Sequence, residues 1–184
     1  MHDTDKNIID RLRKGDQSAL KYLFDVYYRE LVIYAMKIVV NRGVAEETVQ
    51  DLFIRLWKNR SRLNLQKSLQ AYLITAVRNR CVNFIKSRYG RTRFEDLDGI
   101  DQYSNAEAAD MNVTVRELRE AIHNAVRLLP PKCKIIFNLS RNAGMTVDEI
   151  AAQLGISGKT VRSQISIAIR KIKAHLEDQW GELL

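Results

Sequence analysis

Residues 146–173 read TVDEIAAQLGISGKTVRSQISIAIRKIK, and this stretch decides the fold of the C-terminal part of the chain. Thr146, with Glu149 three residues later, fits a capping box, and apolar residues then recur at helical spacing. Gly155 permits a tight turn, and Ser157 can cap a second, longer helix. A short helix, a three-residue turn and a longer basic helix predict a helix-turn-helix, whose second helix enters the major groove of DNA.

The second helix of this motif has an apolar and a polar side. We expect five apolar residues to face inward: Val161, Ile165, Ala168, Ile169 and Ile172. The other side is wholly basic or small, whereas a solvated helix face normally mixes both signs of charge. Base edges are the predicted targets of Lys159, Arg162 and Ser163, with Ser166 beside them. Phosphates are the predicted targets of Arg170, Lys171 and Lys173.

Further helices are predicted on the N-terminal side of the motif, and the whole fold is expected to be all-α. From residue 113 the chain reads as four helices, at Val113–Leu129, Lys132–Asn142, Val147–Leu154 and Gly158 to about Leu176. Three more are expected earlier. The first follows a cap at Asp16 and stops at Asn41 and Gly43, and the others run from Val44 to Asn59 and from Ser68 to Arg88. No segment shows the period-2 alternation of a strand.

Charge falls into three blocks, which divide the chain into two basic helical domains and a linker. Residues 1–94 carry 19 bases and 9 acids, and residues 113–184 carry 11 bases and 7 acids. Residues 95–112 carry six acids and no base, so the net charge of +8 understates the basicity of each domain. We expect a flexible acidic linker between two small helical domains that contact a phosphate-rich partner.

The predicted helix over residues 68–88 contains no acid, although its polar side carries Thr75, Arg78, Asn79, Asn83 and Lys86. A solvated face would pair such bases with acids one turn away, so the pattern favours a phosphate-facing surface. Asn79 offers a donor and an acceptor together, which suits a base edge. Trp57 and Tyr72 are able to stack on bases, but aromatic residues at these helical positions are more often part of the core.

Several classes of function are disfavoured by the composition. Cys81 and Cys133 lack metal-ligand spacing and are expected to be buried free thiols, and the three histidines are isolated in sequence. No phosphate-cradling loop, no pair of carboxylates with metal-ligand spacing and no nucleophile-base set appears, so we expect no catalysis, no metal, no cofactor and no small-molecule substrate. No apolar stretch reaches the length of a membrane span, and we expect a cytoplasmic protein.

Four motifs in one order resemble the bacterial sigma-70-type sigma factors of the extracytoplasmic-function (ECF) group. They are residues 49–57 (VQDLFIRLW), residues 72–80 (YLITAVRNR), residues 128–133 (LLPPKC) and the helix-turn-helix. The C-terminal motif alone also occurs in response-regulator output domains, whereas the ordered set is specific. The Pro-Pro-Lys-Cys junction and residues 163–166 look closest to the Bacteroidetes-type subgroup.

The resemblance implies a sigma 2 domain at residues 1–94, a linker at 95–112 and a sigma 4 domain at 113–184. It implies that the protein binds core RNA polymerase through the beta-prime and beta subunits and directs initiation at promoter DNA under control of an anti-sigma factor. Implied contacts to core polymerase are Glu47, Gln50 and Asp51. Implied contacts to the −10 element are Arg62, Lys67, Arg78, Asn79, Asn83, Lys86 and Arg88. The helix from residue 158 would read the −35 element, although Arg162 and Ile167 depart from the family pattern.

Two alternatives remain at this point. A stand-alone helix-turn-helix regulator that binds duplex operator DNA would account for the C-terminal half, but would leave the acid-free helix over residues 68–88 without a purpose. A nucleic-acid-processing enzyme is disfavoured, because the sequence contains none of the constellations such chemistry requires.

Overall fold

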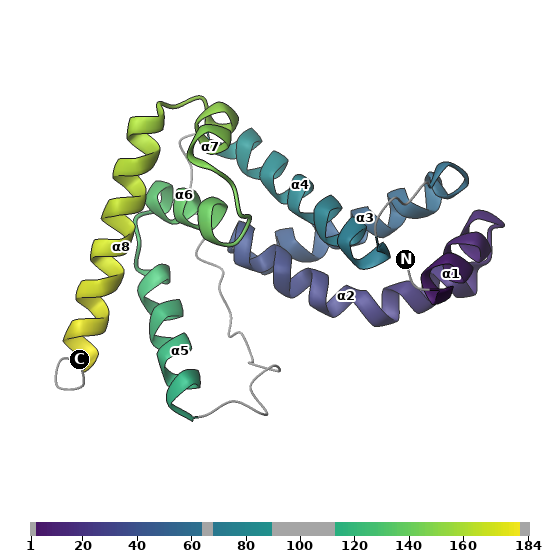
Figure 1. The fold of residues 1–184 in the computed structure, drawn as a ribbon, viewed down its shortest axis with the longest axis horizontal. Helices are drawn as coiled ribbons and strands as arrows, with labels where there is room; N and C mark the ends of the chain where they lie inside the picture. Colours follow the sequence, from purple (N-terminus) through teal and green to yellow (C-terminus); the bar gives the residue numbers. More distant parts are fainter. Residues whose placement is uncertain (1–2, 64–67, 90–112, 181–184) are drawn as a thin grey trace. The chain divides into compact units, whose positions relative to one another are not determined.

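The computed structural model describes residues 3–63, 68–89 and 113–180, and within these ranges the protein is all-helical, as expected. The chain divides into two compact units, at residues 1–87 and 88–184. The described helices of the N-terminal unit are α1 (Asp3–Arg13), α2 (Gln17–Val39), α3 (Arg42–Lys58), the short 3-10 helix η1 (Arg60–Arg62) and α4 (Leu69–Tyr89). Those of the C-terminal unit are α5 (Val113–Arg127), α6 (Pro131–Arg141), α7 (Val147–Leu154) and α8 (Gly158–Trp180). Figure 1 shows both sets.

α1 was not predicted, although the sequence contains a signal for it. Ile8, Ile9 and Leu12 are spaced for one helical face, and all three are buried against the rest of the N-terminal unit. α1 packs against α2 and η1. The pattern is short and is interrupted by charged residues, so periodicity alone gives it little weight.

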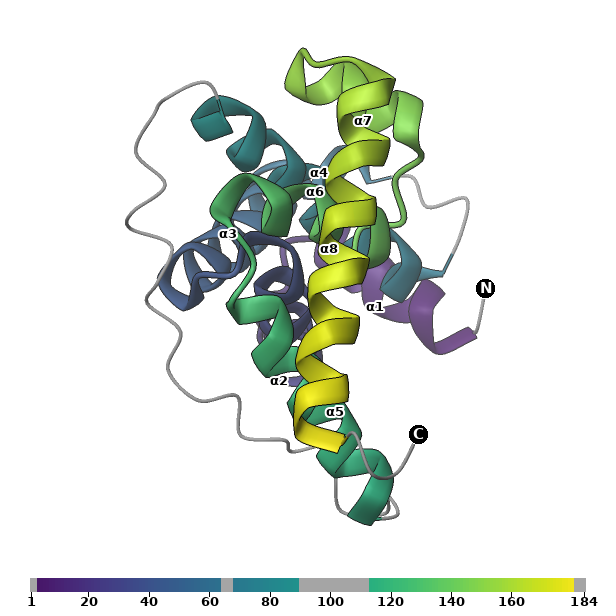
Figure 2. The same cartoon turned by 90° about the vertical axis from the view of Figure 1, so that its left-hand side faces the viewer.

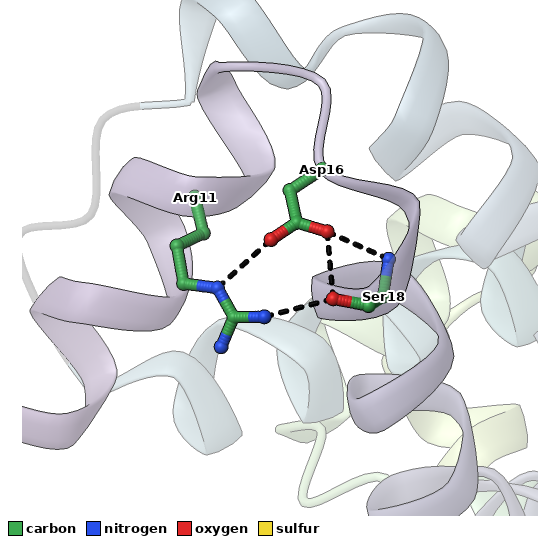
Figure 3. A network of polar contacts seen from close by, with 3 residues as sticks. All are labelled: Arg11, Asp16 and Ser18. Atoms are coloured by element: carbon green, nitrogen blue, oxygen red, sulfur yellow. Dashed lines mark hydrogen bonds and ion pairs between the residues drawn. The ribbon is translucent and has the colours of Figure 1, made fainter.

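A network of polar contacts joins α1 to the start of α2 (Figure 3). Asp16 is the N-cap of α2, as expected, and its carboxylate accepts a hydrogen bond from the backbone N–H of Ser18 at 2.8 Å. The same carboxylate accepts from the Arg11 Nε at 2.9 Å, and Arg11 also donates to the Ser18 hydroxyl at 2.8 Å. One carboxylate therefore caps α2 and fixes the end of α1 beside it.

The junction of α2 and α3 differs from the expectation. α2 ends at Val39, and Val40 adopts a left-handed conformation with φ of 56°. Asn41 is the N-cap of α3, where its side-chain oxygen accepts from the Val44 N–H at 2.9 Å. Gly43 lies inside the first turn of α3, so the prediction that it stops the preceding helix was wrong. The Asn41 side chain can begin the next helix at once, which makes a glycine terminator unnecessary.

The core of the N-terminal unit lies between α2, α3 and α4. The expected stripe of α3 is buried, comprising Val49, Leu52, Phe53 and Leu56. From α4, the buried set includes Leu69, Leu73, Val77, Cys81 and Ile85. Phe24 of α2 packs on Phe53 of α3, with ring centroids 5.1 Å apart. Because α4 buries this whole stripe, its polar side is left on the surface of the unit.

α8 is the central helix of the C-terminal unit, and α5, α6 and α7 all pack against it (Figure 2). Ile136, Leu139, Ile150 and Val161 are fully buried. A second cluster holds Leu129, Cys133 and Ala168, with Val126, Phe137, Ile167 and Ile172 packed against it.

Two details of α8 correct the sequence prediction. Ile169, which we expected to face inward, is 45% exposed, whereas Ile167 packs against the core. The reason is tertiary, because the buried side of α8 is set by the helices around it and not by the apolar spacing along α8 alone. α8 also runs to Trp180, beyond the expected end near Leu176.

Candidate nucleic-acid interface

The helix-turn-helix forms by the local interactions that its sequence predicts. The Thr146 N–H donates to the Glu149 carboxylate at 2.8 Å, and the Glu149 N–H donates to the Thr146 hydroxyl at 3.2 Å, which completes the capping box. Gly155 ends α7 in the left-handed region with φ of 67°. The Ser157 hydroxyl then accepts from the Thr160 N–H at 3.0 Å and caps α8. Two capped helices and a glycine turn therefore fix the angle between α7 and α8.

Six of the seven predicted −35 residues lie on one side of α8. With about 100° of rotation per residue, an arc of about 100° measured from Arg162 contains five others. These are Lys159, Ser163, Ser166, Arg170 and Lys173, and all are exposed. Lys173 also forms an exposed ion pair with Glu177 at 3.4 Å. The face is otherwise free of acids, since none occurs between residues 158 and 176.

Lys171 is the exception among the predicted −35 residues. It lies about 180° around α8 from Arg162. Burial raises the pKa of the Cys133 thiol in α6, and the charge of Lys171 partly opposes that rise, which places Lys171 on the side of α8 that faces α6. The structure therefore does not bring Lys171 together with the other six residues.

Ile169 is a member of this face that sequence reasoning missed. It is 45% exposed and lies about 20° around α8 from Arg162. It had been assigned to the core because it continues an apolar run, so only the neighbouring helices reveal where it points. An exposed apolar side chain on such a face is able to contact the methyl group of thymine.

A second polar face lies on α4 in the N-terminal unit. Asn79, Asn83 and Lys86 are exposed and lie within about 60° of one another around the helix. Arg78 lies about 100° from Asn79 and is partly buried. Burial raises the pKa of Tyr34 in α2, and the nearby charge of Arg78 opposes that rise. α4 contains no acid along its whole length, so this face is polar to cationic.

The other predicted −10 residues are more scattered. Arg88 is exposed but lies about 180° around α4 from Asn79. Arg62 is exposed on η1, and Lys67 lies outside the described residues. The structure therefore brings together Asn79, Asn83 and Lys86, and it leaves Arg78 and Arg88 on other sides of the helix.

The aromatic candidates are only partly buried, and one of them is already engaged. The guanidinium of Arg60 lies 4.4 Å from the centroid of the Trp57 ring and also donates to the Trp57 carbonyl at 3.0 Å. A cation over the indole face occupies the surface on which a base would stack, so Trp57 acts here as a packing residue. Tyr72 is half-buried on α4.

The predicted polymerase contacts lie on one side of α3. Glu47 and Gln50 are exposed, and Asp51 is half-exposed and ion-paired with Arg80 of α4. Ile54, which is 50% exposed, lies between these polar residues around the helix. Sequence reasoning missed Ile54, although its position outside the buried stripe of α3 is a signal that was available. The face thus combines carboxylates with one exposed apolar side chain.

Other classes of site are not found in the part of the chain that the structure describes. No group of three or more His, Cys, Asp or Glu side chains is placed to hold a metal ion in these ranges. Cys81 and Cys133 are free and buried, as expected, and burial raises the pKa of the Cys81 thiol to about 12. None of the described helices combines the length and apolar character needed to cross a membrane.

Comparisons with known proteins agree with the division into two units. The family model "Sigma-70 region 2" matches residues 23–91, and "Sigma-70, region 4" matches residues 119–172. The ECF RNA polymerase sigma-E factor of Escherichia coli strain K12 is 25% identical over 173 residues, covering 88% of both chains. The ECF RNA polymerase sigma factor SigK of Mycobacterium bovis BCG is 23% identical over 174 residues, covering 92% of both chains.

Among solved structures, the chain is similar to the sigma factor RpoE in complex with the anti-sigma factor NepR from Bartonella quintana. The identity is 20%, the match covers 85% of this chain and 96% of that chain, and the TM-score is 0.45.

The N-terminal unit decides between the alternatives that the sequence left open. A stand-alone regulator needs only the helix-turn-helix, whereas here the unit with the acid-free helix α4 matches the other conserved region of sigma factors. Sigma factors are non-enzymatic regulators of RNA polymerase. With both regions present in family order, the chain belongs to the sigma-70 family of RNA polymerase sigma factors, in its ECF group, and acts in promoter-directed transcription initiation.

Proposed function

We propose that the two units divide promoter recognition between them, as the charge blocks of the sequence suggest. The N-terminal unit binds core RNA polymerase through α3 and captures the melted −10 element with η1 and α4. The C-terminal unit reads the −35 element as duplex DNA with α8. The observation that carries the proposal is the pair of acid-free helix faces, one on α4 and one on the first five turns of α8, in separate units.

The exposed side of α3 is suited to a protein partner. Glu47, Gln50 and Asp51 supply charge and hydrogen-bonding capacity, and Ile54 supplies apolar surface at the centre of the patch. An apolar anchor ringed by polar groups is the usual make-up of a binding hot spot. The beta-prime and beta subunits of core polymerase are the proposed partners, with α3 meeting beta-prime.

The face of α4 is suited to a single strand. Unstacking a base costs a few kcal/mol, so an opened promoter needs both cations for its phosphates and polar groups for the extruded base. Asn79 and Asn83 each offer a donor and an acceptor, and Lys86 lies beside them with a cation. Arg62 on η1 adds a second cation, and Lys67, although outside the described residues, stays a candidate. Arg78 and Arg88 are proposed only as contacts to backbone away from the extruded base.

The face of α8 is suited to the major groove. Lys159, Arg162 and Ser163 lie near its N-terminal end, where recognition helices meet base edges, and Arg170 and Lys173 lie farther along for phosphates. Lys171 lies on the opposite side of α8 from Arg162 and contributes charge at a distance.

The chain has no catalytic role of its own in this proposal, and it uses no cofactor. It works in the cytoplasm, where the chromosome and the polymerase are, and an anti-sigma factor controls its access to the enzyme. The acidic segment 95–112, which lies outside the described residues, repels DNA and so keeps the two contacts separate.

The test combines the protein with sigma-free core polymerase and measures promoter-specific transcript from a promoter selected by the complex. Asn79→Ala should reduce promoter opening, seen as permanganate reactivity of unpaired thymines, while affinity for core polymerase is unchanged. Gln70→Ala is the matched control, because Gln70 is exposed on α4 about 180° from Asn79. An unchanged permanganate pattern in Asn79→Ala would remove Asn79 from the strand-binding face.

The −35 role is tested on duplex DNA that carries only the upstream element. Arg162→Ala should weaken binding by about tenfold and relax the preference for the −35 sequence, since a bidentate base contact contributes about 1–3 kcal/mol of discrimination. Lys171→Ala removes the same charge from the opposite side of α8 and should weaken binding less. Equal losses from both variants, on native and scrambled −35 sequences alike, would reduce α8 to a nonspecific charge.

A further inference from the structure

The last turn of α1 lies against η1, although α1 precedes the segment of the chain that matches sigma-70 region 2. We propose that Arg13 of α1 is a positioning residue for −10 recognition, which holds η1 and its exposed Arg62 in place for the melted strand. The inference rests on the proposed role of η1 and extends it to a helix outside the matched region.

Arg13 forms hydrogen bonds with the main chain directly after η1. Its Nε donates to the Leu63 carbonyl at 3.0 Å, and its Nη2 donates to the same oxygen. The third nitrogen, Nη1, donates to the Asp10 carboxylate at 2.9 Å, which orients the guanidinium from within α1. A planar guanidinium with each nitrogen engaged has little freedom to rotate. The Leu63 carbonyl is therefore fixed 50 residues away in sequence from the side chain that binds it.

α1, which carries Arg13, is itself held in place on the N-terminal unit. Three residues on the inner face of α1 are buried, namely Ile8, Ile9 and Leu12. Arg11, two residues before Arg13, is tied to Asp16 and Ser18 at the start of α2, as Figure 3 shows. The buried face and this polar junction together set the position of α1 on the unit.

The other end of η1 is held by α3. Arg60 stacks on Trp57 and donates to its carbonyl at 3.0 Å. A Cβ added to Gly15 would lie 3.7 Å from the Arg60 Nε, so the turn between α1 and α2 runs close to this side chain. η1 is thus held at its first residue by α3 and just after its last residue by α1, which leaves Arg62 between two fixed points.

A segment fixed before DNA arrives loses less conformational entropy when it binds the strand. Without Arg13, the Leu63 carbonyl would be released and η1 would have to be ordered by the DNA itself. The expected consequence is a loss of −10 selectivity with no loss of affinity for polymerase or for −35 duplex DNA.

The experiment compares Arg13→Ala, Arg13→Lys and Lys14→Ala in the full-length protein bound to core polymerase. Lys14→Ala is the matched control, because Lys14 is the next residue, is exposed and carries the same charge. The readout is promoter opening on a promoter selected by the wild-type complex, divided by opening on the same promoter with its −10 element scrambled. We expect Arg13→Ala to lower this ratio by about tenfold, Arg13→Lys to retain part of it with its single donor group, and Lys14→Ala to leave it unchanged.

A double-mutant cycle separates positioning from simple structural support. If Arg13 acts through η1, Arg62→Ala and Arg13→Ala together should lower the ratio little more than Arg62→Ala alone. Multiplicative effects, or an equal loss of core affinity in Arg13→Ala, would overturn the inference. Should Arg13→Ala unfold the N-terminal unit, the ratio in folded Arg13→Lys decides, and a wild-type value there also overturns it.

The cycle also distinguishes this inference from the proposed function. If Arg62→Ala lowers the ratio and Arg13→Ala does not, the inference alone fails. If Arg62→Ala has no effect, the assignment of η1 to the −10 element fails, and the inference fails with it.

Discussion

At the scale of the residue, the charge of Asp16 supports the junction of α1 and α2, because its carboxylate accepts hydrogen bonds from both helices. Hydrogen bonds from Ser18 and from Arg11 lower the pKa of its carboxyl from the ordinary aspartate value of 3.8 to about 2. The folded state therefore prefers the ionised carboxylate, so the contribution of this network to stability is complete above pH 3.8. It is lost as the pH falls through about 2, where the folded protein also takes up the proton.

The first prediction concerns Ser18, whose hydroxyl lowers the pKa of Asp16 more than Arg11 does. Because the Ser18 hydroxyl is the largest influence, Ser18→Ala should raise the pKa of Asp16 from about 2 toward 3.8. The check is an NMR titration of the Asp16 carboxyl carbon in both proteins. Gln17→Ala serves as the control, since its exposed side chain lies between the two residues in sequence. A titration midpoint unmoved by Ser18→Ala would show that the hydroxyl contact is not made in solution.

Arg80 shows how a single residue links two proposed surfaces. It ion-pairs with Asp51 on the side of α3 that we propose binds polymerase, and it directly follows Asn79 in α4. Asp51 is thus not fully available to a partner, and Glu47, Gln50 and Ile54 are the better candidates for first contact. Because the ion pair is partly exposed, it contributes little to stability, and its main effect is to hold the two side chains in position.

At the scale of the element, the direction of α8 depends on the turn that precedes it. Gly155 has a left-handed φ of 67°, and a Cβ built there would meet nothing within 4 Å. The cost of a side chain at this position is therefore the backbone conformation alone, which amounts to about 1–2 kcal/mol.

The second prediction is that Gly155→Ala destabilises the C-terminal unit by this amount and weakens −35 binding by changing the angle between α7 and α8. Gly158→Ala should do neither, because Gly158 begins α8 with ordinary helical geometry and its Cβ would lie at a normal 3.5 Å from Val147. Chemical denaturation followed by circular dichroism measures the stability of both variants, and titration with −35 duplex DNA measures their binding. Equal stability of the two variants would mean that the turn can rearrange without cost.

At the scale of the whole molecule, the protein is two units, each with its own core. Ile136 and Leu73 are both fully buried, the first in α6 and the second in α4. Truncating a buried Ile or Leu to Ala costs about 2–5 kcal/mol, a large share of the stability of a unit this small.

The third prediction is that each core truncation acts within its own unit. Ile136→Ala should reduce hydrogen-exchange protection in α5 to α8 and leave α1 to α4 as they are, and Leu73→Ala should do the reverse. Mass spectrometry of exchanged peptides separates the two sets. Loss of protection in both units from either variant would show that the chain unfolds as one cooperative body.

The interior faces of most helices could be predicted from sequence, because helical periodicity is a local property. Val49, Leu52, Phe53 and Leu56 are all buried as their spacing predicts, and the capping box and glycine turn of the helix-turn-helix form as written. Candidate site residues were harder to predict, since polar residues on a helix share a face only if their angular positions around the helix axis are similar. Lys171 and Arg88 were grouped by sequence proximity, and the geometry of their helices separates them.

By itself, the sequence determined every described α-helix except α1, the order of the two sigma regions and the placement of charge, because capping, periodicity and motif order are written within short stretches of chain. Only the tertiary structure decided that Ile169 faces outward, that Ile167 packs inward and that α1 holds η1 through Arg13. Each of these depends on which neighbour covers a helix, and the contact from Arg13 to Leu63 spans 50 residues. Local spacing carries no information about such a neighbour, so the fold had to bring it into place.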